Sequence, residues 1–402
     1  MLRALLTWVC VLAGCRGTSP GGAIQEQELA RIVDSLRPAV ERATALRFRG
    51  PIASAFRDRA QLREFLIAKL GEDFPPEREE GTAAVYRLLG LIPDTLNLRA
   101  LLVDLYTEQV AGFYDPATRT LYGLRGANPA ELRLVLAHEM VHALQHQYLP
   151  LDSLLRARGN GDGQTAAQAF LEGHATLASI KVLTPGQDVV SRPEFWQLFR
   201  DQIRQQQGSM QVFARTPLAL RFELIFPYLY GAEFVRWWDS ARTAEPLPSL
   251  ATMPRSTEQV MHPARYADGN QPLVLRFADS SAALLFEDTM GEMGVQTVTS
   301  VLAGRNEIAT EPAAGWGGDR FRAYRTEEGP ALVWYIAWDD ASSLERFDRG
   351  AGATLLARAR AGYRTTVERV RGPGPVPVSR VVIAPEGWTG WRKLPSLRLN
   401  GS

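Results

Sequence analysis

The stretch LAHEMVHALQHQ (residues 136–147) holds three of the five histidines of this 402-residue chain, at positions 138, 142 and 146. Its segment HEMVH (138–142) fits the pattern H-E-x-x-H, which is typical of zinc sites on helices. Residues four apart lie one turn apart on the same helix face, so His138 and His142 can converge on a single Zn²⁺. Glu139 would lie beside that metal and could accept a proton from water. The motif therefore predicts a metal site with Zn²⁺ as its cofactor.

The residues around the motif predict the helix that such a site needs. Asn128 followed by Pro129 is typical of a helix N-terminus, with a capping side chain and a proline in the first turn. The other residues of the helix are largely apolar and include Leu134, Val135, Val141 and Leu144. We therefore expect this helix to be mostly buried, with the metal site at the edge of the core.

The sequence offers three candidates for a third ligand. His146 continues the histidine stripe, but residues eight apart on a straight helix are separated by about 12 Å along its axis. No glycine follows His142 to turn the chain, so we expect His146 near the site or at the surface. Glu172 and His174 lie in FLEGHA (170–175), on the next predicted helix. They point in different directions, so at most one of the two is expected to bind the metal.

The N-terminus has the features of an export signal. Residues 1–15, MLRALLTWVCVLAGC, carry one arginine before an apolar run that is too short to span a bilayer. The ending Leu-Ala-Gly-Cys resembles a bacterial lipobox, although an ordinary signal peptide with an incidental cysteine is the alternative. Residues 1–14 are thus predicted to be the signal peptide, Cys15 the lipidated residue and residues 15–23 a flexible tether. We expect an exported protein, lipid-anchored to the bacterial cell envelope on its periplasmic or outer surface.

Composition limits the remaining possibilities. With 46% hydrophobic and 22% charged residues, the chain is typical of a globular protein with a full core. Its formal net charge of +1 predicts no attraction to nucleic acid. After removal of the signal peptide one cysteine would remain, so a core and a metal, rather than disulfides, would stabilise the protein. The membrane partner is expected to be reached through the lipid anchor, because no later stretch reaches about 18 consecutive apolar residues.

The periodicity of apolar residues predicts an α+β fold in two parts. Helical patterns fill most of residues 24–268, the domain that would carry the metal site. A β-hairpin at 109–124, with its turn at Asp115-Pro116, interrupts these helices. Residues 269–398 mix strands and helices and are predicted to form a small C-terminal α+β unit. Its aromatic cluster Trp334, Tyr335 and Trp338 is expected to be core packing.

Four further segments carry local signals. Pro38 is expected to break or kink the first helix (24–48). The glycine-rich residues 158–164 predict a loop, and proline at each end of 254–266 predicts another. The apolar pattern at 282–303 predicts one continuous helix.

The order of these motifs resembles the gluzincin arrangement of zinc metallopeptidases, H-E-x-x-H followed by a glutamate on a later helix. More narrowly, the chain is similar to a group of bacterial lipoproteins and secreted proteins with a gluzincin-like metallopeptidase domain. The resemblance covers about residues 45–350 and rests on QVAGFYDP (109–116), LAHEMVHALQHQ (136–147), FLEGHA (170–175), FPYLYG (226–231), STEQVMHP (256–263) and GWGGDR (315–320). It implies a mostly helical zinc peptidase core with a small hairpin or sheet before the active-site helix.

Carried over to this chain, the resemblance implies His138, His142 and Glu172 as metal ligands. It also implies Glu139 as the general base. The family often has an acidic residue two positions after the third ligand, where this chain has His174. The partner of the third ligand is therefore expected to differ here.

The implied reaction is zinc-assisted hydrolysis of a peptide bond in a peptide or protein substrate. A donor must stabilise the oxyanion that forms, and His262 and Tyr228 are the candidates. A loop histidine bonded to the backbone and a packing tyrosine are the structural alternatives for these two residues. Glu258 and Gln259 could orient His262.

Two other functions fit the same motifs: a non-catalytic, zinc-stabilised envelope or interaction module, and a zinc hydrolase acting on a non-peptide amide. Glu139 favours an enzyme, because a structural site needs no base and usually closes with a fourth protein ligand. The hairpin at 109–124 could bind an extended substrate as an additional strand, or it could only pack on the zinc helix. The sequence indicates no particular oligomeric state.

Overall fold

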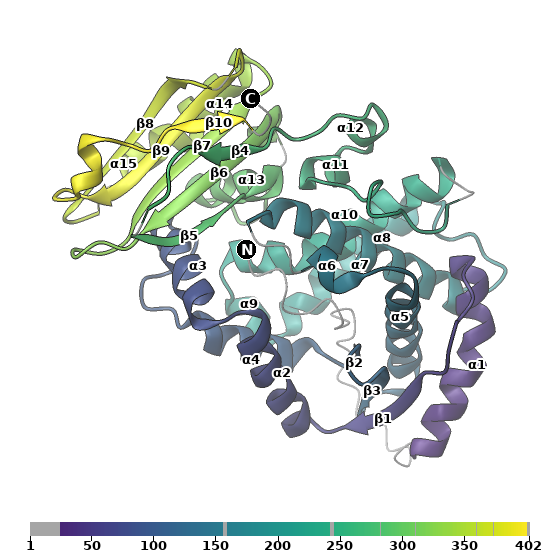
Figure 1. Cartoon of the computed structure of the whole chain (residues 1–402). Helices are drawn as coiled ribbons and strands as arrows, with labels where there is room; N and C mark the ends of the chain where they lie inside the picture. Colours follow the sequence, from purple (N-terminus) through teal and green to yellow (C-terminus); the bar gives the residue numbers. More distant parts are fainter. Residues whose placement is uncertain are drawn as a thin grey trace.

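The metal motif lies in the helical part of an α+β chain whose C-terminal end is a five-stranded sheet, so the predicted fold class is confirmed (Figure 1). The computed structural model describes residues 25–155, 159–241, 245–281, 283–309, 311–358, 360–372 and 374–399. The predicted signal peptide, Cys15 and the tether lie outside these residues.

The helical part begins with α1 and ends with α12. Its elements are α1 (Glu26–Thr44), β1 (Ala53–Arg57), α2 (Arg59–Asp73), α3 (Pro76–Leu88), α4 (Leu98–Gln109), β2 (Gly112–Asp115), β3 (Thr120–Leu124), α5 (Pro129–Tyr148), α6 (Leu151–Leu155), α7 (Gly161–Leu183), α8 (Pro193–Ser209), α9 (Gln211–Arg215), α10 (Leu218–Ala241), α11 (Thr257–Met261) and α12 (Pro263–Ala267). The C-terminal part contains β4 (Leu275–Phe277), β5 (Leu284–Asp288), α13 (Gly291–Leu302), β6 (Trp316–Tyr324), β7 (Ala331–Trp338), α14 (Ala341–Phe347), α15 (Ala353–Ala357), β8 (Tyr363–Arg371), β9 (Pro377–Pro385) and β10 (Leu397–Leu399).

The first helix does not break at its proline. Helix α1 continues through Pro38 to Thr44, so of the expected break or kink the break is wrong. The buried side chains of α1 include Leu29, Val33 and Val40, which belong to the same hydrophobic cluster as residues of α5. Tertiary packing of this face outweighs the hydrogen bond that the proline removes.

Helix α7 begins within the predicted glycine-rich loop, and that part of the loop prediction is wrong. The Asn160 side chain accepts a hydrogen bond from Gly163 N at 3.2 Å, which caps the helix. The backbone N–H of Gly161 donates to Oδ1 of Asp288, a residue of β5, at 2.6 Å. Long-range contacts therefore start the helix where the local glycine content predicts a loop.

The expected helix at 282–303 is also wrong, because this segment divides into β5 and α13. The buried carboxylate of Asp319 accepts hydrogen bonds from Met290 N at 2.8 Å and Gly291 N at 2.9 Å, so it caps α13. The predicted loop at 254–266 contains the short helices α11 and α12, and the Ser256 side chain caps α11.

A three-stranded sheet with the strand order β1-β3-β2 lies beside α5, the helix that carries the H-E-x-x-H motif. The predicted hairpin forms its antiparallel pair β2–β3. Strand β1 pairs parallel to β3, from Ala53 opposite Thr120 to Arg57 opposite Leu124, and this strand had no signal in the sequence analysis. Strand β2 is thus at the edge of the sheet.

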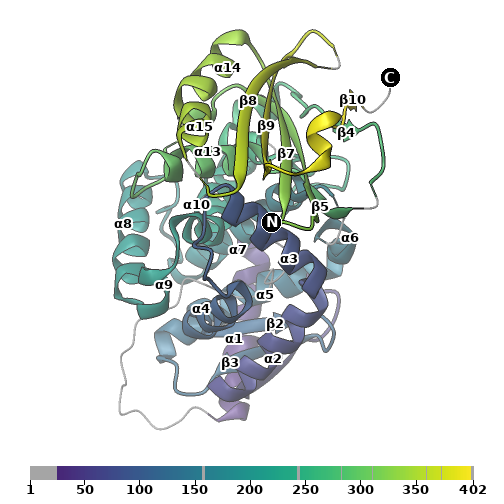
Figure 2. The ribbon, with the colours of Figure 1, turned by 90° about the vertical axis from the view of Figure 1, so that its left-hand side faces the viewer.

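The large sheet is antiparallel, with the strand order β5-β6-β7-β9-β8. Helices α13, α14 and α15 cover one face and the β4–β10 ribbon covers the other (Figure 2). Trp334 and Trp338 point to the helical face, while Tyr335 points to the ribbon, as alternation along a strand requires. All three are buried, so their prediction as core residues is confirmed.

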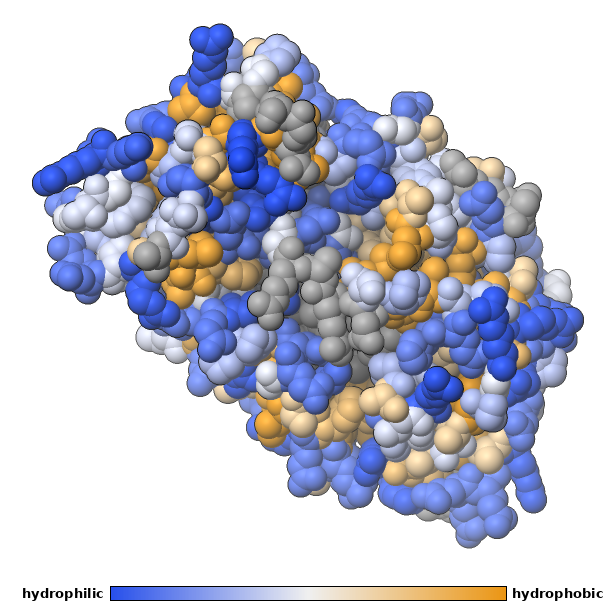
Figure 3. Space-filling model, viewed as in Figure 1, coloured by the Kyte–Doolittle hydropathy of each residue, from blue (hydrophilic) through white to orange (hydrophobic). Residues whose placement is uncertain are grey.

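The surface mixes polar and apolar residues. On the face drawn in Figure 3, hydrophobic side chains form several patches between hydrophilic ones. Exposed large apolar side chains include Ile67 on α2, Leu198 on α8 and Leu356 on α15. Within the described ranges, no helix combines the length and hydrophobicity needed to cross a bilayer.

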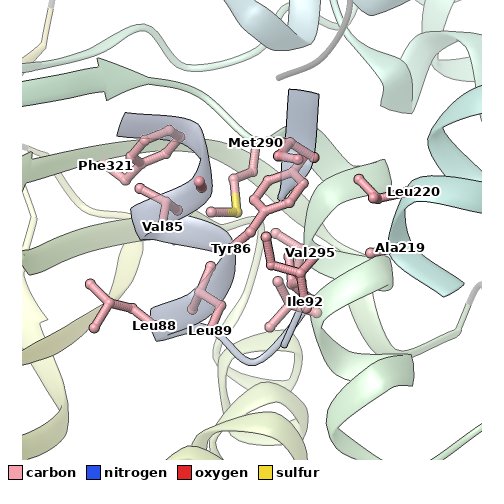
Figure 4. Packing of buried hydrophobic residues seen from close by; sticks show 14 of the residues in the cluster. Val85, Tyr86, Leu88, Leu89, Ile92, Ala219, Leu220, Met290, Val295 and Phe321 are labelled. Atoms are coloured by element: carbon pink, nitrogen blue, oxygen red, sulfur yellow. The ribbon is translucent and has the colours of Figure 1, made fainter. Parts of the chain in front are cut away.

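One hydrophobic cluster joins the helical part to the sheet. Figure 4 shows Tyr86 of α3 next to Met290, which precedes α13, and Val295 of α13, and Leu220 of α10 belongs to the same cluster. The same cluster includes Phe321 of β6. The domain boundary at residues 268–269 stays a prediction. The parts of the chain on either side of it share this hydrophobic cluster.

Helices α7 and α10 touch backbone to backbone. A Cβ atom at Gly173 would lie 2.1 Å from the carbonyl carbon of Gly231, and one at Gly231 would lie 1.9 Å from the carbonyl oxygen of Ala169. Gly173 therefore serves the close packing of α7 against α10.

Replacing Gly231 with alanine should destabilise the protein, because the new methyl group collides with the rigid α7 backbone. We expect Gly231→Ala to lower the free energy of unfolding by about 1–3 kcal/mol in urea denaturation. Gly71→Ala on α2 is the control, since nothing lies within 4 Å of a Cβ there. It should raise stability by about 0.5–1 kcal/mol. Equal effects of the two substitutions would contradict the proposed close contact.

Candidate metal centre

Three side chains from two helices converge in the interior. His138 and His142 come from α5, and Glu172 comes from α7. The Nε2 atoms of the two histidines are 3.1 Å apart, and Oε2 of Glu172 lies 3.2 Å from His138 Nε2 and 3.3 Å from His142 Nε2. All three residues are fully buried. They are the one group of at least three His, Cys, Asp or Glu residues in the described part of the chain that could hold a metal ion.

The spacing of these atoms fits a metal ligand set. A tetrahedral zinc site with bonds of about 2.0–2.1 Å has its ligand atoms about 3.3–3.4 Å apart. The three observed separations, 3.1, 3.2 and 3.3 Å, lie close to that value. In addition, Oε1 of Glu172 is buried and has no hydrogen-bond partner among the described residues. A buried carboxylate with an unmatched oxygen is costly, and a cation at this point would offset the cost.

Burial and the close contacts within the cluster shift the pKa values of His138 and Glu172. Burial lowers the pKa of His138, which favours the neutral imidazole that can bind a metal. Burial opposes the charged form of Glu172, but the two adjacent histidines outweigh it and lower the pKa of this carboxyl. A carboxylate and two imidazoles are the hard and borderline donors that suit Zn²⁺.

Glu139 lies on the same helix but is held by the small sheet. Its Oε2 atom accepts a hydrogen bond of 2.9 Å from the backbone N–H of Tyr114 in β2. The side chain is fully buried. A backbone donor on the edge strand thus fixes the orientation of the carboxylate next to the two histidines.

Gln145 connects the two ligand helices. Its Oε1 atom lies 2.9 Å from His142 Nδ1, so the amide oxygen accepts that proton and leaves Nε2 of His142 available to a metal. Its Nε2 atom donates to the carbonyl oxygen of Leu171 at 2.9 Å and lies 3.1 Å from His174 Nδ1. Gln145 therefore orients one ligand and anchors the backbone next to another.

His174 does not join the cluster. It points toward Gln145 from two residues beyond Glu172. Burial lowers the pKa of His174 to about 4, so its ring is neutral at pH 7 and Nδ1 can accept the Gln145 proton. The neutral His174, bonded to Gln145, thus occupies the position at which the resembled family often has an acidic residue.

His146 also lies outside the three-residue cluster. Its Nδ1 atom is 3.1 Å from the hydroxyl of Tyr114. Burial raises the pKa of Tyr114 to about 12, so this hydroxyl stays protonated and can donate to His146. The helix continues straight past His142 to Tyr148, as expected, and carries His146 toward the hairpin.

The two predicted oxyanion donors have different surroundings. Tyr228 of α10 is buried, and its ring is stacked on that of His138 with 6.1 Å between centroids. His262, between α11 and α12, is half-exposed and lies 3.0 Å from Glu292 of α13. This contact, with its hydrogen bond, raises the pKa of His262. The structure thus brings Tyr228 to the cluster and pairs His262 with a buried carboxylate.

The residues expected to orient His262 have other partners. Gln259 accepts from Arg255 N at 2.7 Å and donates to the carbonyl of Asn270 at 2.5 Å, so it fixes the surrounding loop. Burial, reinforced by the charge of Glu292, raises the pKa of Glu258 to about 8.

Sequence reasoning missed Gln145, Glu292 and the Tyr114 backbone N–H. Gln145 had a usable signal, since it lies three residues after His142 on the same helix. Glu292 had none, because it is 30 residues from His262 and belongs to the other part of the fold. The Tyr114 backbone N–H could not be identified from the sequence, because every residue except proline carries the same group.

Comparisons with known proteins add little to this geometry. Residues 282–382 match the family described as "Domain of unknown function (DUF8575)", which corresponds to the C-terminal part. No curated protein matches. One solved structure, described as a putative hydrolase with a novel fold from Chloroflexus aurantiacus, is 21% identical with a TM-score of 0.39, over 61% of this chain and 89% of that chain. At that TM-score the likeness assigns neither fold nor activity.

Removing the Gln145 side chain should weaken metal binding without touching a ligand. Gln145→Ala frees His142 Nδ1 and the Leu171 carbonyl, so the affinity for zinc should fall about 10–100-fold in a chelator competition titration. Gln147→Ala, on the same helix and bonded to Arg49, is the matched control and should leave the affinity unchanged. Equal zinc affinity of the two variants would contradict an orienting role.

Proposed function

We propose that the protein is a zinc-dependent peptidase of the bacterial cell envelope. The observation that carries this proposal is Glu139, whose carboxylate is held by Tyr114 N between two histidines that converge with Glu172. A purely structural zinc site needs no base at this position. We thus propose metal-dependent hydrolysis as the general activity and peptide bonds as the bonds that are cleaved.

Each residue of the cluster has a separate role in the proposed reaction. His138, His142 and Glu172 would hold Zn²⁺, which when bound lowers the pKa of water and polarises a carbonyl group. Glu139 takes a proton from the attacking water and later passes it to the leaving amine. The hydrogen bond from Tyr114 N keeps the carboxylate of Glu139 in one orientation for both transfers.

The small sheet suggests how an extended peptide could bind. Tyr114 N points to Glu139 rather than to β3, so alternate backbone groups of β2 face away from the sheet on the side of the base. By the alternation of an antiparallel pair, we expect Gly112, two residues earlier, to present its backbone in the same direction. A substrate added along this edge as a further strand would have its backbone aligned beside Glu139.

The oxyanion donor is proposed to be Tyr228, with His262 as the second candidate. The ring contact between Tyr228 and His138 supports the tyrosine. The Glu292 partner supports a protonated His262, which could donate only if substrate binding brings the reacting carbonyl to it.

The envelope location is proposed from the N-terminal sequence. Cleavage after Gly14 and lipidation of Cys15 would attach the enzyme to a membrane surface through residues 15–23. Stable attachment needs more than one acyl chain. Peptides or proteins of the envelope are then the substrates within reach.

Substitution of the base separates catalysis from metal binding. For purified residues 16–402, Glu139→Gln should keep the zinc content and lower cleavage of a peptide library about 10²–10⁴-fold. Glu131→Gln, on the first turn of the same helix, is the control and should retain activity. Full cleavage by Glu139→Gln, or absence of zinc from the unaltered protein, would overturn the proposal.

Substitution of the third ligand separates Glu172 from His146. Glu172→Ala should lower zinc affinity more than about a hundredfold, since losing a partner of a ligand already costs about 10–100-fold. His146→Ala should change zinc occupancy little, as measured by plasma mass spectrometry after dialysis. The reverse order would assign the third ligand to His146.

A further inference from the structure

A cavity of about 590 Å³ lies between α8, α9 and α10, bordered on one side by residues 306–308. Figure 2 shows α8 and α9 on the left of the molecule, with α10 beside them. The volume is within the range of about 300–1,000 Å³ that is typical of sites for small molecules. Its lining does not include the residues of the metal cluster.

The cavity has a largely apolar wall. The apolar lining residues include Phe213, Leu218, Phe222, Ile225, Leu229 and Ile308. Four of them recur at intervals of three or four residues on α10, so one face of this helix forms a continuous apolar strip. Such a strip suits a hydrocarbon chain.

The charged lining residues leave one cation unmatched. Arg200 forms an ion pair with Glu233, and Arg204 lies 3.8 Å from Glu307. The side chain of Arg221 forms no ion pair or hydrogen bond within the part of the chain that the structure describes, and its Nε atom is buried without an acceptor. A buried donor on a cationic group is costly to leave unpaired, so an anionic group at this point would be stabilising.

We propose that this cavity binds a single-chain fatty carboxylate, with the carboxylate on Arg221 and the hydrocarbon chain along α10. A monoanion fits better than a phosphate dianion, because the lining acids Glu233 and Glu307 already balance the other two arginines. A neutral lipid would leave Arg221 unmatched. This inference does not depend on the metal or on peptidase activity.

Calorimetric titration of the purified protein with laurate, kept below its micelle concentration, tests the proposal. The protein should bind one laurate per chain, and Arg221→Gln should weaken laurate binding about tenfold or more. Dodecanol, which has the same chain without the charge, should bind the unaltered protein more weakly than laurate and should be insensitive to Arg221→Gln.

Two matched variants test the place of binding. Arg63→Gln removes one positive charge from α2, outside the cavity, and should leave laurate affinity unchanged. Ala214→Trp fills the cavity from the exposed surface of α9 and should abolish binding. Absence of laurate binding, equal binding of dodecanol, an unaffected Arg221→Gln or an unaffected Ala214→Trp would each overturn the proposal.

Discussion

The position of α7 between α5 and α10 is the constraint on which the rest of the site depends. On one side, the backbone of Gly231 meets the Ala169 carbonyl so closely that neither helix could carry a side chain there. On the other side, the amide of Gln145 bonds to the carbonyl of Leu171, one residue before Glu172. One backbone contact and one side-chain hydrogen bond thus fix the depth and rotation of α7, and through them the 3.2 Å approach of Glu172 to His138.

This arrangement buries ionisable groups at considerable cost. His138, Glu139, His142 and Glu172 are all fully buried, and a charged group removed from water is stable only if its charges and hydrogen bonds are matched. Tyr114 N matches one oxygen of Glu139, and Gln145 matches His142. Oε1 of Glu172 has no such match among the described residues, so binding of a cation would contribute to folding as well as to chemistry.

The sequence predicts the parts of the site that are local. H-E-x-x-H and the Asn128-Pro129 start predict α5, because helical spacing and capping act within a few residues. Glu172 came from a family resemblance, since helix spacing argued against His146 but left Glu172 and His174 both open. The sequence could not predict the supports of α7 and α13, which are long-range: Asp288 bonds to Gly161 N and Asp319 caps α13. Asn160 is a local cap at the start of α7, but the bond from Gly161 N to Asp288, 127 residues away, has no local signal.

The same long-range bonds tie the C-terminal sheet to the candidate metal centre. Asp288 at the end of β5 accepts from the first residue of α7, and Asp162 in that turn accepts from Thr257 N of α11 at 3.0 Å. Carboxylates at a helix N-terminus also interact favourably with its dipole, so these contacts stabilise the start of the helix that carries Glu172. Glu292 of α13 in turn bonds to His262. The C-terminal part therefore contacts both the helix that carries Glu172 and the candidate donor His262. A sheet that caps a ligand helix and positions a candidate donor is a structural part of the site, and its loss would be expected to loosen the metal centre from a distance.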